Sequence, residues 1–125
     1  MPGETRGVPL AVVMTIIERE GIGPVRDIGL LASALARPHT TLMGADAYPS
    51  IELKAAALLH SVCLNHALVD GNKRLSALLA LIFLDINGAE TTLTNDQIFD
   101  LTMAVASGAL RDVDKIAPRL QVVSR

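Results

Sequence analysis

The feature that most limits how this chain can fold is the segment 72–86, which is apolar almost all round at helical spacing. A helix without a polar face has to be buried, so this segment is predicted to be the central helix of the domain. Asn87 and Gly88 end it, because glycine is favoured just beyond helix C-termini. Its apolar part, residues 75–84, is far shorter than the roughly 20 residues that a membrane span requires.

Five further helices are predicted from capping residues and from the glycines and prolines that stop helices. The clearest start is Thr94-x-x-Gln97, a capping-box pattern in which each side chain bonds to the other residue's backbone. The least regular helix is the last, because Pro118 falls inside it. Residues 37–49 lack helical periodicity and are predicted to form a long loop. The predicted helices are 9–20, 28–36, 51–64, 95–106 and 113–122, with Asp27, Ser50 and Asp112 as N-caps.

These elements predict an all-α, compact single-domain bundle of about six helices around the central one. The domain is expected to span residues 1–125, with residues 1–7 as a loose N-terminus, and little in the sequence suggests strands. Half of the residues are hydrophobic but only 2% are aromatic, so leucine, alanine, valine and isoleucine have to build the core. The small side chain of alanine lets helices approach closely.

The charge and cysteine content exclude several classes of protein. A formal net charge of −2 argues against non-specific binding of nucleic acids or membrane surfaces. The single cysteine, Cys63, excludes an internal disulfide and a cysteine-based zinc site, and its apolar helical surroundings predict that it is buried. His39 is interpreted as a solvated loop residue and His60 as a structural helix residue. The apolar stretch 8–17 lacks a basic flank and a cleavage site, so we expect a cytoplasmic protein.

The central helix is preceded by residues 66–74, where the apolar sequence becomes polar and gathers a histidine, a carboxylate, a Gly-Asn turn and two cations. A glycine turn that opens a helix directs unpaired backbone N–H groups, and the positive end of the helix dipole, at whatever lies in front. Phosphate is the usual anion at such a position. The stretch therefore predicts a phosphate site.

Each polar residue of this stretch has a candidate role. His66 is the candidate general base, because histidine exchanges protons readily near neutral pH. Asp70 is the candidate magnesium ligand, since Mg²⁺ prefers carboxylate and phosphate oxygens. The candidate phosphate-binding groups are Gly71, Asn72, Lys73 and Arg74. A purely structural interpretation, with a helix cap, an ordinary turn and solvated cations, is open for each residue alone, but it does not require so many polar groups together.

Residues 66–74, His-Ala-Leu-Val-Asp-Gly-Asn-Lys-Arg, resemble the signature of the Fic/Doc family, His-x-Phe-x-Asp/Glu-Gly-Asn-x-Arg. The resemblance is to the Doc branch, the death-on-curing toxins of bacterial toxin–antitoxin pairs, and extends to residues 27–38, 48–49 and 100–108. It implies a helical fold of the predicted kind and a flap, formed by residues 37–49, beside the active site. Leu68 stands where the family usually has phenylalanine, which is expected to anchor the loop in the core.

The family resemblance also bears on the reaction. Fic enzymes that transfer AMP typically read Gly-Asn-Gly-Arg-x-x-Arg, whereas this chain has Lys73 and Ala77 in place of the second glycine and the second arginine. The lysine side chain prevents close approach of phosphates to the backbone, and the alanine removes one phosphate clamp. The resemblance therefore implies a kinase-type phosphotransferase that uses ATP and Mg²⁺.

The partners are implied by the resemblance alone. The implied substrate is a hydroxyl group of elongation factor Tu, and the consequence is arrest of translation and growth. The implied regulator is a cognate antitoxin whose C-terminal segment covers the active site as a helix in a groove. No direct contact with nucleic acid or membrane is expected. Two alternatives remain: a Fic-type adenylyltransferase, and a catalytically silent member that acts as a binding module, which Leu68 makes conceivable.

Overall fold

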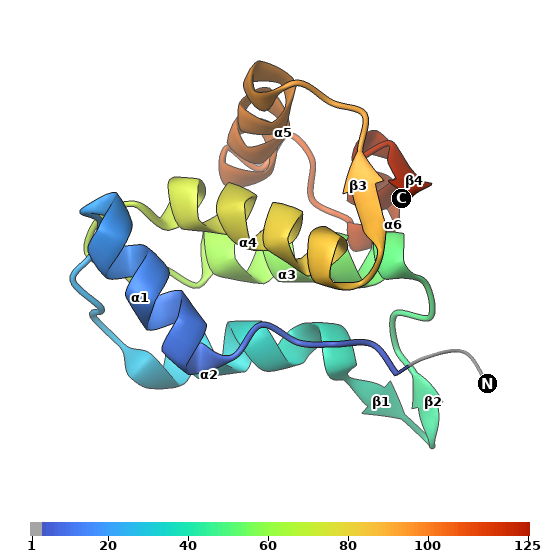
Figure 1. Ribbon diagram of the computed structural model, residues 1–125, viewed down its shortest axis with the longest axis horizontal. Helices are drawn as coiled ribbons and strands as arrows, with labels where there is room; N and C mark the ends of the chain where they lie inside the picture. Colours follow the sequence, from blue (N-terminus) through green and yellow to red (C-terminus); the bar gives the residue numbers. More distant parts are fainter. Residues whose placement is uncertain (1–3) are drawn as a thin grey trace.

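The computed structural model describes residues 4–125 and confirms the all-α fold class: six α-helices dominate this part of the chain (Figure 1). The helices are α1 (Leu10–Glu20), α2 (Ile28–Ala36), α3 (Ile51–Leu64), α4 (Asn72–Ile86), α5 (Asn95–Ala106) and α6 (Val113–Arg119). The shorter elements are a 3₁₀ turn, η1 (Arg37–His39), and the strands β1 (Thr41–Leu42), β2 (Ala45–Asp46), β3 (Ala89–Thr91) and β4 (Val122–Ser124).

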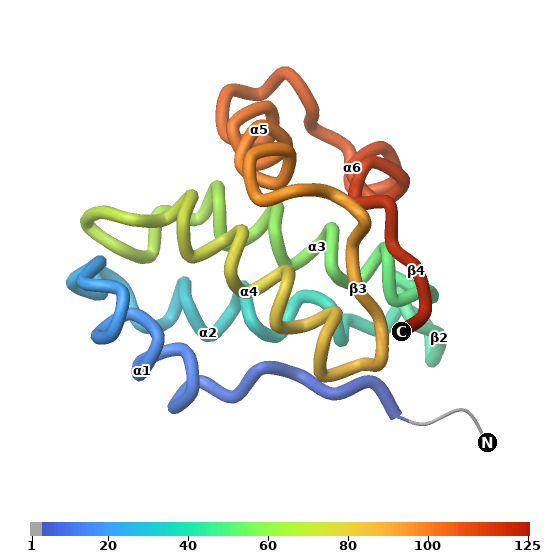
Figure 2. The backbone as a smooth tube through the Cα atoms, turned by 45° about the horizontal axis from the view of Figure 1, so that its top comes forward, coloured from blue at the N-terminus to red at the C-terminus, as the bar shows by residue number. Residues whose placement is uncertain are grey.

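Two helices, α3 and α4, form the centre of the molecule and lie side by side in both views (Figures 1 and 2). The predicted central helix α4 buries residues such as Leu75, Leu79 and Phe83. The helix α3 is buried over even more of its length, and its three alanines at 55–57 are fully inaccessible. Because alanine has the smallest side chain that still forms helix well, these positions let the surrounding elements pack closely on α3. The predicted central helix α4 therefore shares the middle of the molecule with α3.

The predicted N-caps account for three of the six helix starts in the described residues. Asp27 accepts a hydrogen bond from the Leu30 N–H at 3.0 Å, and the Ser50 hydroxyl accepts one from the Leu53 N–H at 3.1 Å. Thr94 and Gln97 form the reciprocal capping box. These bonds satisfy backbone donors that a helix start leaves free, which is why local sequence sufficed to predict the starts.

The last helix departs from the prediction. Asp112 occupies the N-cap position without a side-chain hydrogen bond, and α6 ends at Arg119 instead of continuing to residue 122. The β-branched residues that follow form β4, which pairs antiparallel with β3, Val123 lying opposite Glu90. The prediction of a helix to residue 122 was wrong because it ignored a strand partner far away in the sequence.

The predicted long loop, residues 37–49, contains η1 and a β-hairpin formed by β1 and β2. Met43 and Gly44 at the hairpin turn both have positive φ, 52° and 82°, which is the conformation of a type I′ two-residue hairpin turn. Figures 1 and 2 place the hairpin at the end of the molecule opposite to the loop between α3 and α4. The expected flap beside residues 66–74 is therefore not formed by this hairpin.

The start of the described chain is attached to the end of α4. The Arg6 N–H donates to Oδ1 of Asn87 at 2.8 Å, and Nδ2 of Asn87 donates to the Arg6 carbonyl at 2.9 Å. Part of the segment predicted to be a loose terminus is thus held in place, whereas residues 1–3 of it lie outside the described residues. Within residues 4–125, every helix is too short or too polar to cross a membrane.

Candidate active site

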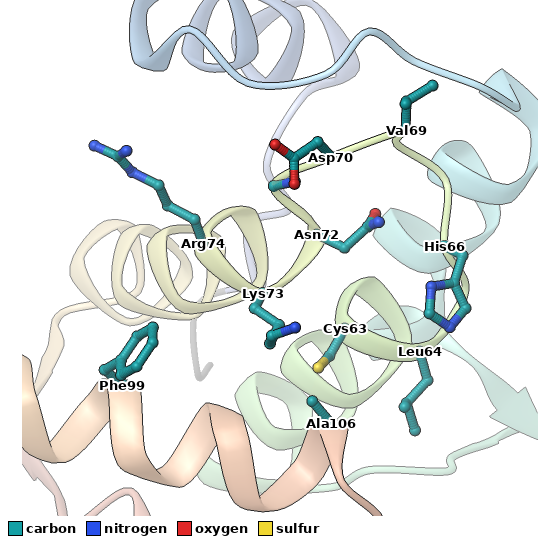
Figure 3. Close-up of a pocket in the computed structure, with 11 residues that line it drawn as sticks. Cys63, Leu64, His66, Val69, Asp70, Asn72, Lys73, Arg74, Phe99 and Ala106 are labelled. Carbon is teal, nitrogen blue, oxygen red and sulfur yellow. The ribbon is translucent and has the colours of Figure 1, made fainter.

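A cavity of about 420 Å³ lies at the N-terminus of α4 (Figure 3). Its walls come from the end of α3, from the loop at residues 65–71 that we call the motif loop, from the first turn of α4, and from α5. The structure brings all six predicted site residues to this one cavity: His66, Asp70, Gly71, Asn72, Lys73 and Arg74. The other lining residues are Cys63, Leu64, Val69, Phe99 and Ala106.

The α5 wall was not predicted. Phe99 and Ala106 are apolar and lie far beyond the motif in the sequence. They reach the cavity because α5 packs against α4. Phe99 is one of the few aromatic residues of this chain, and it is 54% exposed. The family resemblance of residues 100–108 drew attention to this segment, but the sequence alone does not show that Phe99 is exposed or that α5 reaches the cavity.

The motif loop is held by the linker between α1 and α2, residues 21–27, which runs antiparallel beside it. The linker exchanges backbone hydrogen bonds with the loop, among them the Gly23 N–H to the Asp70 carbonyl at 2.9 Å. Backbone bonds of this kind fix the loop independently of its side chains. The hydrogen-bonded pairs are Gly23 with Asp70, Pro24 with Val69, Arg26 with Ala67 and Asp27 with Ala67. Val25 lies opposite Leu68 as an antiparallel bridge between the bonded pairs.

Leu68 anchors the middle of the motif loop. Its side chain is only 2% exposed and belongs to the hydrophobic core, so the leucine fills the place expected for phenylalanine. The side chain of Asn72 holds both backbone polar groups of Leu68: Oδ1 accepts from the Leu68 N–H at 3.0 Å, and Nδ2 donates to its carbonyl at 2.9 Å. The predicted phosphate-binding role of Asn72 therefore has only its backbone N–H available.

Gly71 is the residue at which the loop turns into α4. Its φ of 92° lies in the left-handed region, and a Cβ atom built on it would lie 2.5 Å from Cβ of Ile22. Both facts favour glycine at this position. The Gly71 N–H donates to Oδ1 of Asp70 at 2.9 Å, so one Asp70 oxygen caps the turn.

The first turn of α4 offers backbone donors to the cavity. The Leu75 N–H donates to the Gly71 carbonyl at 2.9 Å and is the first to complete a helical turn. The N–H groups of residues 72–74 precede that bond and are the ones that a helix leaves without an internal partner. They face the direction from which an anion binds at a helix N-terminus.

The two cations of the motif point in different directions (Figure 3). Lys73 extends into the cavity toward Cys63, whereas Arg74 extends away from it. Nη2 of Arg74 forms an ion pair with Oε1 of Glu20 at 2.7 Å, at a position where the Arg74 side chain is 62% exposed. Lys73 is therefore the cation that lies deeper in the site, and Arg74 lies at its rim.

His66 lies at the opposite side of the cavity from Arg74, beside Leu64 (Figure 3). It is exposed, and its φ of 52° is unusual for a residue other than glycine. The imidazole is thus accessible to a substrate. His39 is also exposed, but it does not line this cavity. Its ring packs edge-to-face against that of Phe83, with 6.2 Å between the ring centroids.

Cys63 and His60 have structural surroundings. Cys63 is 2% exposed, as predicted, and burial raises the pKa of its thiol, an effect that the nearby Lys73 charge opposes. His60 is half-buried, and its Nδ1 lies 2.7 Å from Nη1 of Arg37. Burial and the Arg37 charge lower the pKa of His60. Its position among these contacts supports a structural role.

The residues present fit a magnesium ion that arrives with a nucleotide. Within residues 4–125, no three histidine, cysteine, aspartate or glutamate side chains gather closely enough to hold a metal ion by themselves. Asp70 offers one carboxylate at the cavity, with one oxygen engaged by Gly71. Mg²⁺ is commonly bound by one or two carboxylates together with substrate phosphates and water, which suits this donor set.

Two comparisons with known proteins agree with one another. The model of the Fic/DOC family matches residues 10–84, which include α1, the linker, the motif loop and most of α4. Toxin Doc of Mycolicibacterium smegmatis (strain ATCC 700084 / mc(2)155) is 50% identical over 98 residues, which cover 77% of this chain and 75% of that protein.

Proposed function

Because this chain belongs to the Doc toxin branch of the Fic/Doc family, we propose that it transfers the γ-phosphate of ATP to a hydroxyl group of a translation factor. The observation that supports this proposal best is the single cavity that joins His66, Asp70 and Lys73 to the free amides at the start of α4. A proton acceptor, an acidic metal ligand and an anion site are the groups that phosphoryl transfer requires.

The phosphates of ATP would bind at the first turn of α4. The N–H groups of residues 72–74 and the Lys73 ammonium supply positive charge there. Asp70 would hold Mg²⁺, which neutralises phosphate charge when it is bound. Arg74 can contribute only if its guanidinium leaves Glu20, a move that its exposure permits. Gly71 contributes mainly by shaping the turn, since its N–H already bonds to Asp70.

His66 would act as the general base. The hydroxyl oxygen of the target attacks the γ-phosphorus, and the bond from that phosphorus to the β–γ bridging oxygen breaks, so ADP leaves. The imidazole accepts the hydroxyl proton during the attack and later releases it to water. General-base assistance contributes about 10²–10⁴-fold, while positioning and charge stabilisation supply most of the remaining acceleration.

The target and the regulator follow from the family. We propose elongation factor Tu as the target, with inhibition of translation and growth arrest as the outcome. We also propose that a cognate antitoxin covers the cavity with its C-terminal segment. Three apolar residues at the cavity remain accessible for a helix-in-groove contact: Leu64 (36% exposed), Val69 (63%) and Phe99 (54%).

The test is incubation of the purified protein with elongation factor Tu, Mg²⁺ and ATP labelled on either the γ- or the α-phosphate. We expect label from γ-labelled ATP alone. Transfer of the α-label would instead identify an adenylyltransferase, against which the Lys73 side chain and Ala77 argue. Absence of both labels would support a catalytically silent binding module.

The role of His66 has a matched control within the chain. The variant His66→Ala should lose labelling of the target while keeping the helical circular dichroism spectrum of the parent. The variant His39→Ala removes another exposed histidine, one that does not line the cavity, and should label normally. Labelling by His66→Ala at the parent rate would remove this residue from the catalytic role.

A further inference from the structure

The backbone of His66 has a conformation that needs support from outside the residue. Its φ is 52°, in the left-handed region that residues with a side chain avoid, because Cβ crowds the following carbonyl oxygen. Such a conformation persists only where the surroundings enforce it. It matters here because φ sets the direction of the Cα–Cβ bond and hence where the imidazole lies.

Arg26 supplies that support. Its Nε donates to the His66 carbonyl oxygen at 3.0 Å, and its Nη2 donates to the same oxygen. A carbonyl oxygen has two lone pairs, so it can accept both bonds, and the planar guanidinium fixes their geometry. Within the described residues, these are the hydrogen bonds that His66 makes.

The rest of the linker does not hold this residue directly. The backbone bonds between linker and motif loop begin at Ala67, whose carbonyl accepts from the N–H groups of Arg26 and Asp27 at 2.7 and 3.1 Å. His66 lies one residue beyond that ladder. The Arg26 side chain therefore extends the contact between linker and motif loop by one residue, to the carbonyl of His66. The orientation of that carbonyl depends on the unusual backbone conformation of His66.

We propose that Arg26 is a positioning residue, whose guanidinium holds the carbonyl of His66 and so keeps the imidazole directed at the cavity. This inference rests on the proposed function, in which His66 takes the proton of the target hydroxyl. Arg26 acts through His66 and does not contact the nucleotide. Without the guanidinium, residue 66 is free to relax to a right-handed conformation, which redirects its side chain.

The kinetic test compares Arg26→Met, which keeps the length of the side chain but has no donor, with Arg26→Lys, which keeps one charged donor. In the Met variant we expect kcat to fall about 100-fold, the usual cost of a misplaced catalytic group. The KM for ATP should not change, since α4 and Lys73 bind the phosphates. The Lys variant should recover part of the loss. Arg19→Met, which removes an exposed arginine of α1, is the matched control and should match the parent.

A second readout does not depend on activity. The scalar coupling between the amide and α protons of residue 66 in ¹⁵N-labelled protein reports φ directly. It should shift in Arg26→Met and stay at the parent value in Arg19→Met. An unchanged coupling in Arg26→Met overturns the proposal, as does a fall in kcat smaller than about threefold or a loss confined to the KM for ATP. If the parent protein transfers no phosphate, the proposed function fails, and the coupling alone then decides whether Arg26 holds His66.

Discussion

Replacing Asn72 by alanine should test whether this residue builds the site or binds substrate. In the structure both polar atoms of its side-chain amide bond to the backbone of Leu68, at 3.0 and 2.9 Å. Leu68 is only 2% exposed, so water cannot easily replace the amide. Truncation at Asn72 should therefore weaken the fold itself, before any effect on nucleotide binding is considered.

The size of the loss follows from these two bonds. Each intramolecular hydrogen bond contributes about 0.5–1.5 kcal/mol net, and a buried group left unpaired costs about 1–3 kcal/mol. We expect Asn72→Ala to lower the free energy of unfolding by about 2–4 kcal/mol, a large share of the roughly 5–15 kcal/mol typical of a domain. Asn72→Asp keeps the acceptor for the Leu68 N–H but turns a carboxylate oxygen toward its carbonyl oxygen, so it should also be less stable than the parent.

Urea unfolding followed by far-ultraviolet circular dichroism is the appropriate assay, because the chain has no tryptophan and a single tyrosine. The matched control is Asn95→Ala, at an exposed asparagine that begins α5, which should change the free energy of unfolding by less than about 0.5 kcal/mol. If Asn72→Ala unfolds at the same urea concentration as the control, the two hydrogen bonds do not stabilise the loop and our assignment is refuted.

Three further predictions concern Leu68, His60 and Cys63. Leu68→Ala should lower the free energy of unfolding by about 2–5 kcal/mol in the same assay, because it empties a buried site. Burial and the Arg37 charge lower the pKa of His60 from its ordinary 6.5, so the unfolded chain binds more protons than the folded one. The free energy of unfolding should therefore fall as the pH falls through 6.5, and it should fall less in His60→Gln. Cys63, whose pKa is raised by burial, should react with a thiol reagent only in denaturant, and rapid reaction of the folded protein would contradict this.

The helix boundaries were predictable because the signals that set them are local. Asp27, Ser50 and the Thr94–Gln97 pair each act on backbone groups within the next three residues. Strands have no such local determinant. The pairing of β4 with β3 joins segments more than 30 residues apart, and the β-branched residues of β4 continue an apolar pattern that also suits a helix.

The sequence predicted most of the polar residues that line the candidate site, but not how the site is built. His66, Asp70 and Lys73 are close in sequence, and their side chains are of the types that serve in proton transfer, metal binding and phosphate binding, respectively. The linker that holds the motif loop acts largely through main-chain atoms, so the identities of its residues carry little signal. Arg26 is the exception, yet an isolated exposed arginine in a linker gives no reason to connect it with a histidine 40 residues later.

The polar residues of the motif thus divide into two groups that mutagenesis has to separate. Gly71 and Asn72 form the turn and hold Leu68, whereas Lys73 projects into the cavity from the first turn of α4 without a described role in packing. An inactive Asn72 variant would therefore not establish contact with phosphate, because a loosened loop also misplaces His66. Loss of activity in a Lys73 variant with the same free energy of unfolding as the parent would establish a contact of Lys73 with phosphate, since the charge would be gone while the loop stayed intact.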